Sequence, residues 1–240
     1  MRFAVFADIH ANLEALKAVL ADAQAHNCDS HVCLGDIVGY NANPRECLKI
    51  VRDMEIPVVK GNHDEQAALD QSLEGFNPLA EQAIRWTREQ LTPEEKQWLR
   101  ELRLVRQVRD FTIVHATLDT PHHWGYVFNQ LDAAGSFNYQ HTTICFYGHT
   151  HAPRAYIRDG VIRGVSLDKL RIEHGRKYFI NVGSVGQPRD GNWHASYCIY
   201  DAVEQTVTLR RIEYDLYTAQ DKIVEAGLPK KLAQRLALGK

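Results

Sequence analysis

The sequence predicts an α/β domain that carries a functional site at the ends of its β-strands. Short apolar runs, typical of buried strands, are separated by longer stretches with helical periodicity. Six of these runs lead into polar residues, and open α/β sheets bind their ligands beyond the carboxyl ends of the strands. With 240 residues, 45% of them hydrophobic, and no linker-like segment, the chain is expected to form a single domain over residues 1–240.

The polar ends of the apolar runs are the main functional signal. A lone histidine at a strand end is more often a hydrogen-bonded structural residue, but here six separate structural explanations would be needed. Buried carboxylates, imidazoles and amides are unfavourable unless something binds them. We therefore expect the six ends to meet at one site. The segments that follow the runs are Asp8-Ile9-His10, Gly35-Asp36, Gly61-Asn62-His63-Asp64, His115, Gly148-His149-Thr150-His151 and Asn181-Val182-Gly183-Ser184.

The first sixty residues predict alternating strands and helices. Asn12 is a suitable N-cap for a helix with apolar residues at spacings of three and four, and the runs on either side of this helix complete a βαβ unit with parallel strands. Asn43, Pro44 and Glu46 predict a capping box for a second helix that ends near Asp53. A third strand is expected over residues 56–59.

The remainder contains a helical insertion, an irregular loop, a hairpin and a helical tail. The insertion covers about 65–104, with new helix starts at Asn77 and at a capping box beginning with Thr92. Between the strands at 111–114 and 144–147, periodicity is weak, and the segment 117–124 is either a loop that covers substrate or a plain surface loop. Residues 195–201 and 206–214 predict the hairpin, and the tail at about 215–238 is expected to be helical without a chemical role.

Composition narrows the function classes. The 28 basic and 30 acidic residues give a net charge of −2 without a long basic run, which argues against a dedicated nucleic-acid binder and a nuclease with a basic groove. No stretch approaches the length of a membrane-spanning helix, and Asp8 interrupts the N-terminal apolar run before a signal peptide could form. Five cysteines without a C-x-x-C pair predict reduced core thiols, as expected for a cytoplasmic protein.

Seven side chains at the strand ends form a plausible metal-ligand set. They offer carboxylate, imidazole and amide groups without a thiolate, a mixture that suits a catalytic site for manganese, iron, cobalt, nickel or zinc. Seven ligands are too many for one tetrahedral ion, but two ions sharing Asp36 would use all of them. Two metals roughly 3.5–4 Å apart are a known arrangement for displacement at phosphorus. The seven are Asp8, His10, Asp36, Asn62, His115, His149 and His151.

In their order, these motifs resemble the signature of the calcineurin-like metallophosphoesterase superfamily. The resemblance covers the chain from the first strand to about Arg189. The segments 34–40 and 181–189 look more narrowly like the small prokaryotic phosphodiesterases that include diadenosine tetraphosphate hydrolases. The resemblance implies a four-layer αββα sandwich, an α/β fold with two mixed β-sheets face to face and helices outside.

The resemblance also implies roles for the site residues. A hydroxide bridging two divalent metal ions, with manganese as our first choice, would attack phosphorus, and His63 would protonate the leaving oxygen as general acid. The implied ligands of one ion are Asp8, His10, Asp36 and His151, and those of the other ion are Asp36, Asn62, His115 and His149.

The chain departs from the protein phosphatase branch after Asp36. That branch has an aspartate that orients the general acid and then a phosphate-binding arginine, where this sequence has Gly39 and Tyr40. Asp64 is therefore our candidate for orienting His63. Arg189 is a candidate phosphate ligand and Tyr40 a candidate for stacking on a base or phenyl group, although each could be a structural loop residue.

The function predicted from these observations is hydrolysis of a small phosphodiester or a nucleotide phosphoanhydride such as diadenosine tetraphosphate. The partner is a small phosphorylated or nucleotide substrate, neither nucleic acid nor a membrane, and a homodimer remains open. One alternative is a broad-specificity or protein phosphatase. A second is a non-catalytic protein-binding scaffold, since the retromer subunit with this fold resembles these enzymes but lacks the histidine corresponding to His63.

Overall fold

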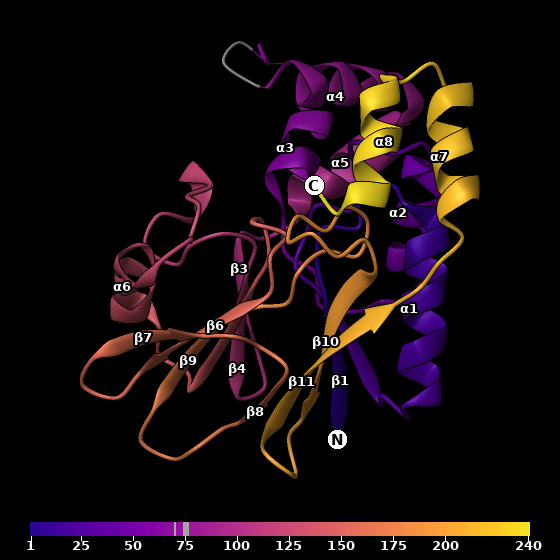
Figure 1. Ribbon diagram of the computed structural model, residues 1–240. Helices are drawn as coiled ribbons and strands as arrows, with labels where there is room; N and C mark the ends of the chain where they lie inside the picture. Colours follow the sequence, from indigo (N-terminus) through magenta and orange to yellow (C-terminus); the bar gives the residue numbers. More distant parts are fainter. Residues whose placement is uncertain (70, 74–76) are drawn as a thin grey trace.

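The computed structural model describes residues 1–69, 71–73 and 77–240, and within them two mixed β-sheets pack against each other (Figure 1). The five-stranded sheet has the order β2 (Ser30–Cys33), β1 (Arg2–Phe6), β10 (Ala195–Asp201), β11 (Thr206–Ile212) and β8 (Lys169–Arg171). The six-stranded sheet has the order β3 (Val105–Val108), β4 (Phe111–Val114), β5 (Ile144–Tyr147), β9 (Lys177–Asn181), β6 (Arg154–Arg158) and β7 (Ile162–Val165).

Each sheet combines a parallel part that ends at the site with an antiparallel part. β1 and β2 are parallel, as the βαβ prediction requires, and β4, β5 and β9 are parallel in the other sheet. The strands β8, β10 and β11 add antiparallel pairs to the first sheet, and β3, β6 and β7 add them to the second. The structure therefore confirms the predicted fold of two mixed sheets with outer helices.

The helices lie on the outer faces of the two sheets. In Figure 1, α1, α2, α7 and α8 are on the side of the five-stranded sheet, and α6 covers the six-stranded sheet. In chain order the helices are α1 (Leu13–Ala25), α2 (Pro44–Asp53), α3 (Asn62–Ala68), α4 (Pro78–Gln90), α5 (Pro93–Glu101), the 3-10 turn η1 (Pro121–His123), α6 (Gln130–Tyr139), α7 (Leu216–Glu225) and α8 (Lys230–Leu238).

Alternation along the strands produces three apolar cores between four layers. In β1, Phe6 belongs to the core shared with the helices, and Phe3 faces the other sheet, where its ring centroid lies 5.2 Å from that of Phe111. In β5, Phe146 joins this same central core, while Tyr147 joins the core under α6. Because side chains of successive residues point to opposite faces of a strand, one short apolar run serves two cores.

Most predicted helix starts are confirmed, with one difference in detail. The Asn12 side chain caps α1, and Thr92 and Glu95 form the expected capping box of α5. Asn43 precedes α2 but its side-chain oxygen makes no capping hydrogen bond, and its amide nitrogen donates to the Glu46 side chain.

Other differences concern extended segments and the irregular loop. Residues 56–59 make only two isolated bridges, between Cys33 and Val58 and between Val59 and Arg103, rather than a full strand. The insertion divides into α3, α4 and α5, and residues 70 and 74–76 of that prediction lie outside the described part. The predicted irregular loop contains η1 and α6. No helix in the described ranges is long and apolar enough to cross a membrane.

Asn12 links the first helix to the loop after β9. Its side-chain oxygen accepts from the backbone nitrogen of Ala15, and its amide nitrogen donates to the carbonyl of Gly186, each at 3.1 Å. The backbone nitrogen of Gly186 in turn donates to the carbonyl of Asp8 at 2.9 Å. One buried cap thus fixes both the helix start and the segment that supports the site.

We predict that Asn12→Ala lowers the free energy of unfolding by about 2–3 kcal/mol, since it removes a cap and leaves the Gly186 carbonyl without its donor. Asp215→Ala is the matched control, because Asp215 caps α7 at an exposed position and accepts from the backbone nitrogen of Thr218. It should lose only about 1 kcal/mol. Urea unfolding in the presence of a chelator measures both, and equal losses would contradict the proposed link.

Candidate metal centre

The structure brings all seven predicted ligand side chains together at the ends of strands from both sheets. Asp8 follows β1 and Asp36 follows β2 of the five-stranded sheet, while His115 follows β4 of the six-stranded sheet. Asn62 is the first residue of α3. His10 follows β1, two residues after Asp8, and His149 and His151 follow β5. Both carboxylates and all four imidazoles are buried. The junction between the two sheets is therefore the position of the candidate centre.

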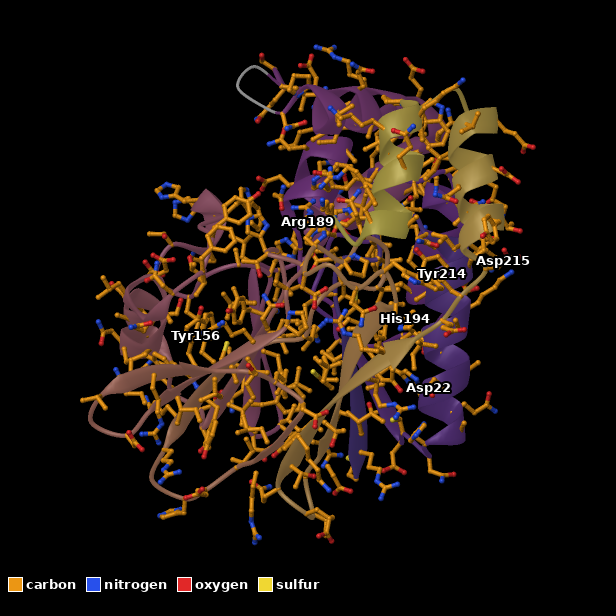
Figure 2. All side chains as sticks on the ribbon, in the orientation of Figure 1. Asp22, Tyr156, Arg189, His194, Tyr214 and Asp215 are labelled. Atoms are coloured by element: carbon orange, nitrogen blue, oxygen red, sulfur yellow. The ribbon has the colours of Figure 1, made fainter. Side chains whose placement is uncertain are left out.

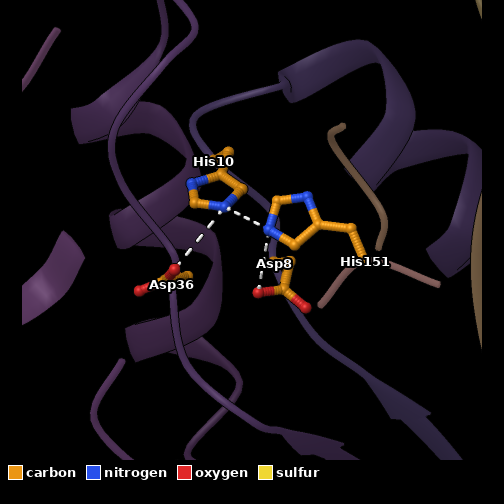
Figure 3. A group of neighbouring side chains, drawn as sticks. All are labelled: Asp8, His10, Asp36 and His151. Carbon is orange, nitrogen blue, oxygen red and sulfur yellow. Dashed lines mark hydrogen bonds and ion pairs between the residues drawn. The ribbon is translucent and has the colours of Figure 1, made fainter. Parts of the chain in front are cut away.

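The first ligand group consists of Asp8, His10, Asp36 and His151, whose ligand atoms lie within 4.8 Å of one another (Figure 3). The Nε2 atoms of His10 and His151 are 3.1 Å apart. Each faces a carboxylate, with 3.5 Å from His10 Nε2 to Asp36 Oδ2 and 3.4 Å from His151 Nε2 to Asp8 Oδ1. Two imidazoles and two carboxylates thus converge on one point.

The second ligand group lies on the other side of Asp36. It contains Asp36, His115 and His149, whose ligand atoms also lie within 4.8 Å of one another. His115 Nε2 is 3.4 Å from Asp36 Oδ2, 3.2 Å from His149 Nδ1 and 3.2 Å from the side-chain oxygen of Asn62. The two groups therefore share Asp36, the residue that the sequence singled out as common to both.

Backbone carbonyls fix the orientation of the four histidine rings. Because a carbonyl only accepts hydrogen bonds, the ring nitrogen that faces it carries the proton. The donors and acceptors are His10 Nδ1 to Val38, His115 Nδ1 to Leu34, His149 Nε2 to Trp124 and His151 Nδ1 to Gln187, at 2.6–3.1 Å. Histidines that bind metals in proteins are usually oriented in this way.

The pair formed by His10 and His151 fits a cation better than it fits a hydrogen bond. Burial lowers the pKa of both rings well below its usual value, so both are neutral near pH 7. Since each Nδ1 carries the proton, the two Nε2 atoms present lone pairs to each other at 3.1 Å. A metal ion would satisfy both lone pairs and the neighbouring carboxylates. The residues present therefore suit the metal dependence expected from the sequence.

Ionisation within the centre is strongly perturbed. Burial, with the Asp36 carboxylate nearby, raises the pKa of Asp8 to about 8. Burial opposes protonation of His115, but Asp36 and Asp8 outweigh it and raise the pKa of His115 to about 9. Burial lowers the pKa of His149 to about 3. Groups with such displaced pKa values are typical of functional sites.

The backbone is strained where it presents the ligands. Five of the seven predicted ligands have positive φ angles of 46–67°, a region that residues other than glycine rarely adopt. Such strain costs about 1–2 kcal/mol per residue and concentrates at functional sites. The five are Asp8, His10, Asp36, His149 and His151.

The sixth polar strand end supports the centre but supplies no ligand. Asn181 donates to the carbonyl of Gly148 and to Thr150 Oγ1, and the Ser184 hydroxyl donates to the carbonyl of Asp8. These bonds hold the loops that carry Asp8 and the histidines after β5. The prediction that this strand end joins the same site is thus met through its hydrogen bonds to the other loops.

His63 borders the first group, but Asp64 does not orient it. The Asp64 carboxylate accepts from the backbone nitrogens of Ile37, Val38 and Gly61, at 2.8, 3.3 and 3.1 Å, so its role is to hold the loop after Asp36. Within the described residues, Nδ1 of His63 has no hydrogen-bond partner. The structure thus gives Asp64 a different role from the predicted one, because backbone donors of the loop after Asp36 and of Gly61 occupy its carboxylate.

Packing holds the His63 ring instead. Its centroid lies 4.7 Å from that of His10 and 4.5 Å from that of Tyr40. Gly39, at φ +93°, leaves the space that Nδ1 occupies, since a Cβ there would lie 2.5 Å from that atom. The glycine that replaces the expected phosphatase aspartate thus makes room for the ring.

Tyr40 and Arg189 also lie beside the centre, in a different relation from the one expected. The Tyr40 side chain is 7% exposed, and the guanidinium carbon of Arg189 lies 5.6 Å from its ring centroid. Most of the ring is therefore already covered, which leaves little face for a base. The backbone nitrogen of Arg189 donates to the carbonyl of His151, so this arginine is tied to the ligand loop.

Two neighbours of the centre were not predicted from the sequence. Tyr126 stacks on the His149 ring at a centroid distance of 4.2 Å, and Arg235 of α8 approaches Tyr40 from the far end of the chain. Tyr126 lies in the loop expected near the substrate, so its position could have suggested a role. Arg235 had no such signal, because its helix shows only amphipathic spacing.

Comparison with known proteins agrees with the geometry. The sequence model of the calcineurin-like phosphoesterase superfamily domain matches residues 1–205. An uncharacterized protein of Methanocaldococcus jannaschii is 40% identical over 242 residues, covering 99% of this chain and 98% of that protein.

Two crystal structures extend the comparison to the fold. A metallophosphoesterase from Sphaerobacter thermophilus is 41% identical, with a TM-score of 0.88 over 100% of this chain and 99% of that one. A hypothetical protein from Pyrococcus horikoshii OT3 has the same fold, with a TM-score of 0.81 and 19% identity over 100% of this chain and 98% of that one.

We predict that metal-free protein loses stability as the pH rises from about 7 to about 9. Burial raises the pKa of Asp8 to about 8, and nearby carboxylates raise that of His115 to about 9. In this range the folded protein holds protons that the unfolded chain has released, so the free energy of unfolding falls by about 1 kcal/mol per pH unit for each titrating group.

Urea unfolding in chelator across this pH range measures the slope. Asp8→Asn removes one of the two groups and should make the decline shallower. A free energy of unfolding that stays constant or increases between pH 7 and 9 would show that these protons are not held in the folded centre.

Proposed function

This chain belongs to the calcineurin-like phosphoesterase superfamily, a superfamily of metal-dependent phosphoesterases, and on that premise we propose that it hydrolyses a small phosphodiester or nucleotide phosphoanhydride. Diadenosine tetraphosphate is the compound we select to represent this class. The observation that carries the proposal is the pair of buried ligand groups that share Asp36.

The residues that would hold the two ions follow from the two groups. Asp8, His10, Asp36 and His151 would bind one divalent cation, and Asp36, Asn62, His115 and His149 the other, with manganese as the first choice. When bound, such cations supply Lewis-acid activation of water and of a phosphoryl oxygen. The carbonyl-oriented rings hold their ligand nitrogens in place, so little reorganisation of the protein is needed.

His63 is our candidate for the proton donor to the leaving oxygen. Its ring lies against His10 of the first group, and Nδ1 is free of protein partners. Burial, opposed by Asp36 and assisted by Arg189, lowers the pKa of His63 to about 4 in the free protein. An anionic substrate beside the ring would raise this pKa and favour the protonated, donating form.

An exposed aromatic pair supports a substrate that contains a base. Tyr126 stacks on His149, and Phe128 lies parallel to Tyr126 with 5.5 Å between ring centroids and 4° between ring planes. The two side chains are 50% and 65% exposed, which is unusual for rings that could otherwise be buried. Bases stack on such rings with about 1–3 kcal/mol each.

We predict that manganese-loaded protein cleaves diadenosine tetraphosphate and that His63→Ala lowers kcat about 10²–10⁴-fold, the usual contribution of general acid catalysis. His141→Ala, at an exposed position on the loop before β5, is the control and should leave kcat unchanged. Chromatography of the nucleotide products gives the rates, and metal analysis checks that the variants retain their ions.

The outcome also separates the alternatives. Hydrolysis of phosphomonoesters but not of the dinucleotide would favour a broad phosphatase or a protein phosphatase. A normally folded, metal-loaded protein that cleaves neither class, with no rate change on His63→Ala, would favour a non-catalytic scaffold.

A further prediction concerns the aromatic pair. Phe128→Leu should raise KM for diadenosine tetraphosphate about fivefold or more, because it removes a stacking surface while retaining an apolar side chain. Tyr139→Leu, which alters another exposed aromatic side chain at the end of α6, is the control. Steady-state kinetics with the two variants decides, and an unchanged KM for Phe128→Leu would exclude base stacking at this position.

A further inference from the structure

The last helix places a second arginine beside the candidate metal centre. The guanidinium carbons of Arg189 and Arg235 lie 5.6 and 6.0 Å from the ring centroid of Tyr40. The Tyr40 ring itself contacts His10 and His63, with centroid distances of 4.7 and 4.5 Å. Figure 2 shows Arg189 near the lower end of α8, where the chain returns to the loops of the site. Two cationic groups therefore flank one ring at the edge of the centre.

Neither guanidinium is paired with a side-chain carboxylate in the described part of the chain. Arg189 donates from Nε and Nη2 to the side-chain oxygen of Gln187, at 3.2 and 2.9 Å, and Arg235 donates from Nε to the backbone oxygen of Lys240 at 2.8 Å. By contrast, Arg210 forms a double hydrogen bond with Asp22. Each of the two guanidinium groups thus retains N–H donors that no side-chain carboxylate of the described residues uses.

The two guanidinium groups repel each other across the Tyr40 ring. Both arginines are partly buried, and burial together with the charge of Arg189 lowers the pKa of Arg235. The shared tyrosine face gives a partial cation–π compensation of about 0.5–2 kcal/mol for each arginine. A bound phosphoryl group would neutralise both charges and use the free donors in the fork geometry that guanidinium groups favour.

We propose that Arg189 and Arg235 form a subsite for a phosphoryl group next to the one that is hydrolysed. The substrate class is then a phosphoanhydride chain, with one phosphate at the metal centre and a neighbouring phosphate between the two arginines. This inference rests on the proposed function, and it gives α8 a role in substrate selection. It also separates this class from simple phosphodiesters, which have no second phosphate for the subsite.

The first test measures binding without catalysis. Isothermal titration of metal-free protein with inorganic tripolyphosphate should show that Arg235→Gln raises Kd about tenfold or more, the factor expected for a lost charged hydrogen bond. Arg235→Lys keeps the charge and should lose less. Lys230→Gln, at an exposed position on the same helix, should leave Kd unchanged. Unaltered binding to Arg235→Gln would overturn the subsite.

The second test measures selectivity in the metal-loaded enzyme. Arg235→Gln should lower the ratio of kcat/KM for diadenosine tetraphosphate to that for bis(p-nitrophenyl) phosphate about tenfold or more. An unchanged ratio would overturn the subsite, and if both kcat/KM values also fell equally, Arg235 would have only a structural role. If the wild-type protein cleaves neither compound, the proposed function fails, but the tripolyphosphate titration still decides the subsite. Thermal unfolding of Arg235→Gln checks that the variant folds.

Discussion

The burial of two carboxylates and four imidazoles within a few ångströms of one another is the constraint on which the rest of the structure depends. Such a cluster is unstable unless each polar atom has a defined partner. The chain meets this requirement with backbone groups. Backbone carbonyls accept hydrogen bonds from the ring nitrogens that point away from the centre, and backbone nitrogens donate to the Asp64 carboxylate and to one oxygen of Asp36. Only the inner atoms, which face the shared point, remain for a cation.

The two-sheet architecture follows from the need to bring these atoms together. Neither sheet alone supplies both groups, since Asp8 and Asp36 follow strands of one sheet and His115 and His149 follow strands of the other. Backbone hydrogen bonds join the two sets of loops, including those from Val185 to the carbonyl of Ala7 and from Gly186 to the carbonyl of Asp8. The apolar core between the sheets therefore does more than stabilise the fold, because it sets the distance between the two halves of the centre.

The sequence was sufficient for the parts of the molecule that depend on local chemistry. Strands such as β4 and β5, the cap at Asn12 and the seven ligand positions all have signals within a few residues. The sequence was not sufficient where the pairing of a strand or the contact of a side chain depends on residues far away in the chain. The strands β6, β7 and β8 are short and partly exposed, so their pairing gave little periodicity. The partners of Asp64 depend on which of several donors reaches its carboxylate in the folded chain. The approach of Arg235 to Tyr40 depends on the packing of two segments that are far apart in the sequence.

The docking of α8 also has a thermodynamic consequence. This helix is held by buried residues such as Leu232 and Leu236 and by a backbone hydrogen bond from Gly191 to Gly239. A terminal helix can detach while the rest of a protein stays folded. The candidate metal ligands all precede Arg189, so detachment would leave the candidate centre intact and remove only the positive charge of Arg235 from its edge. The fraction of molecules in which α8 is docked would then set the affinity for anions that need Arg235. The candidate centre itself would not change.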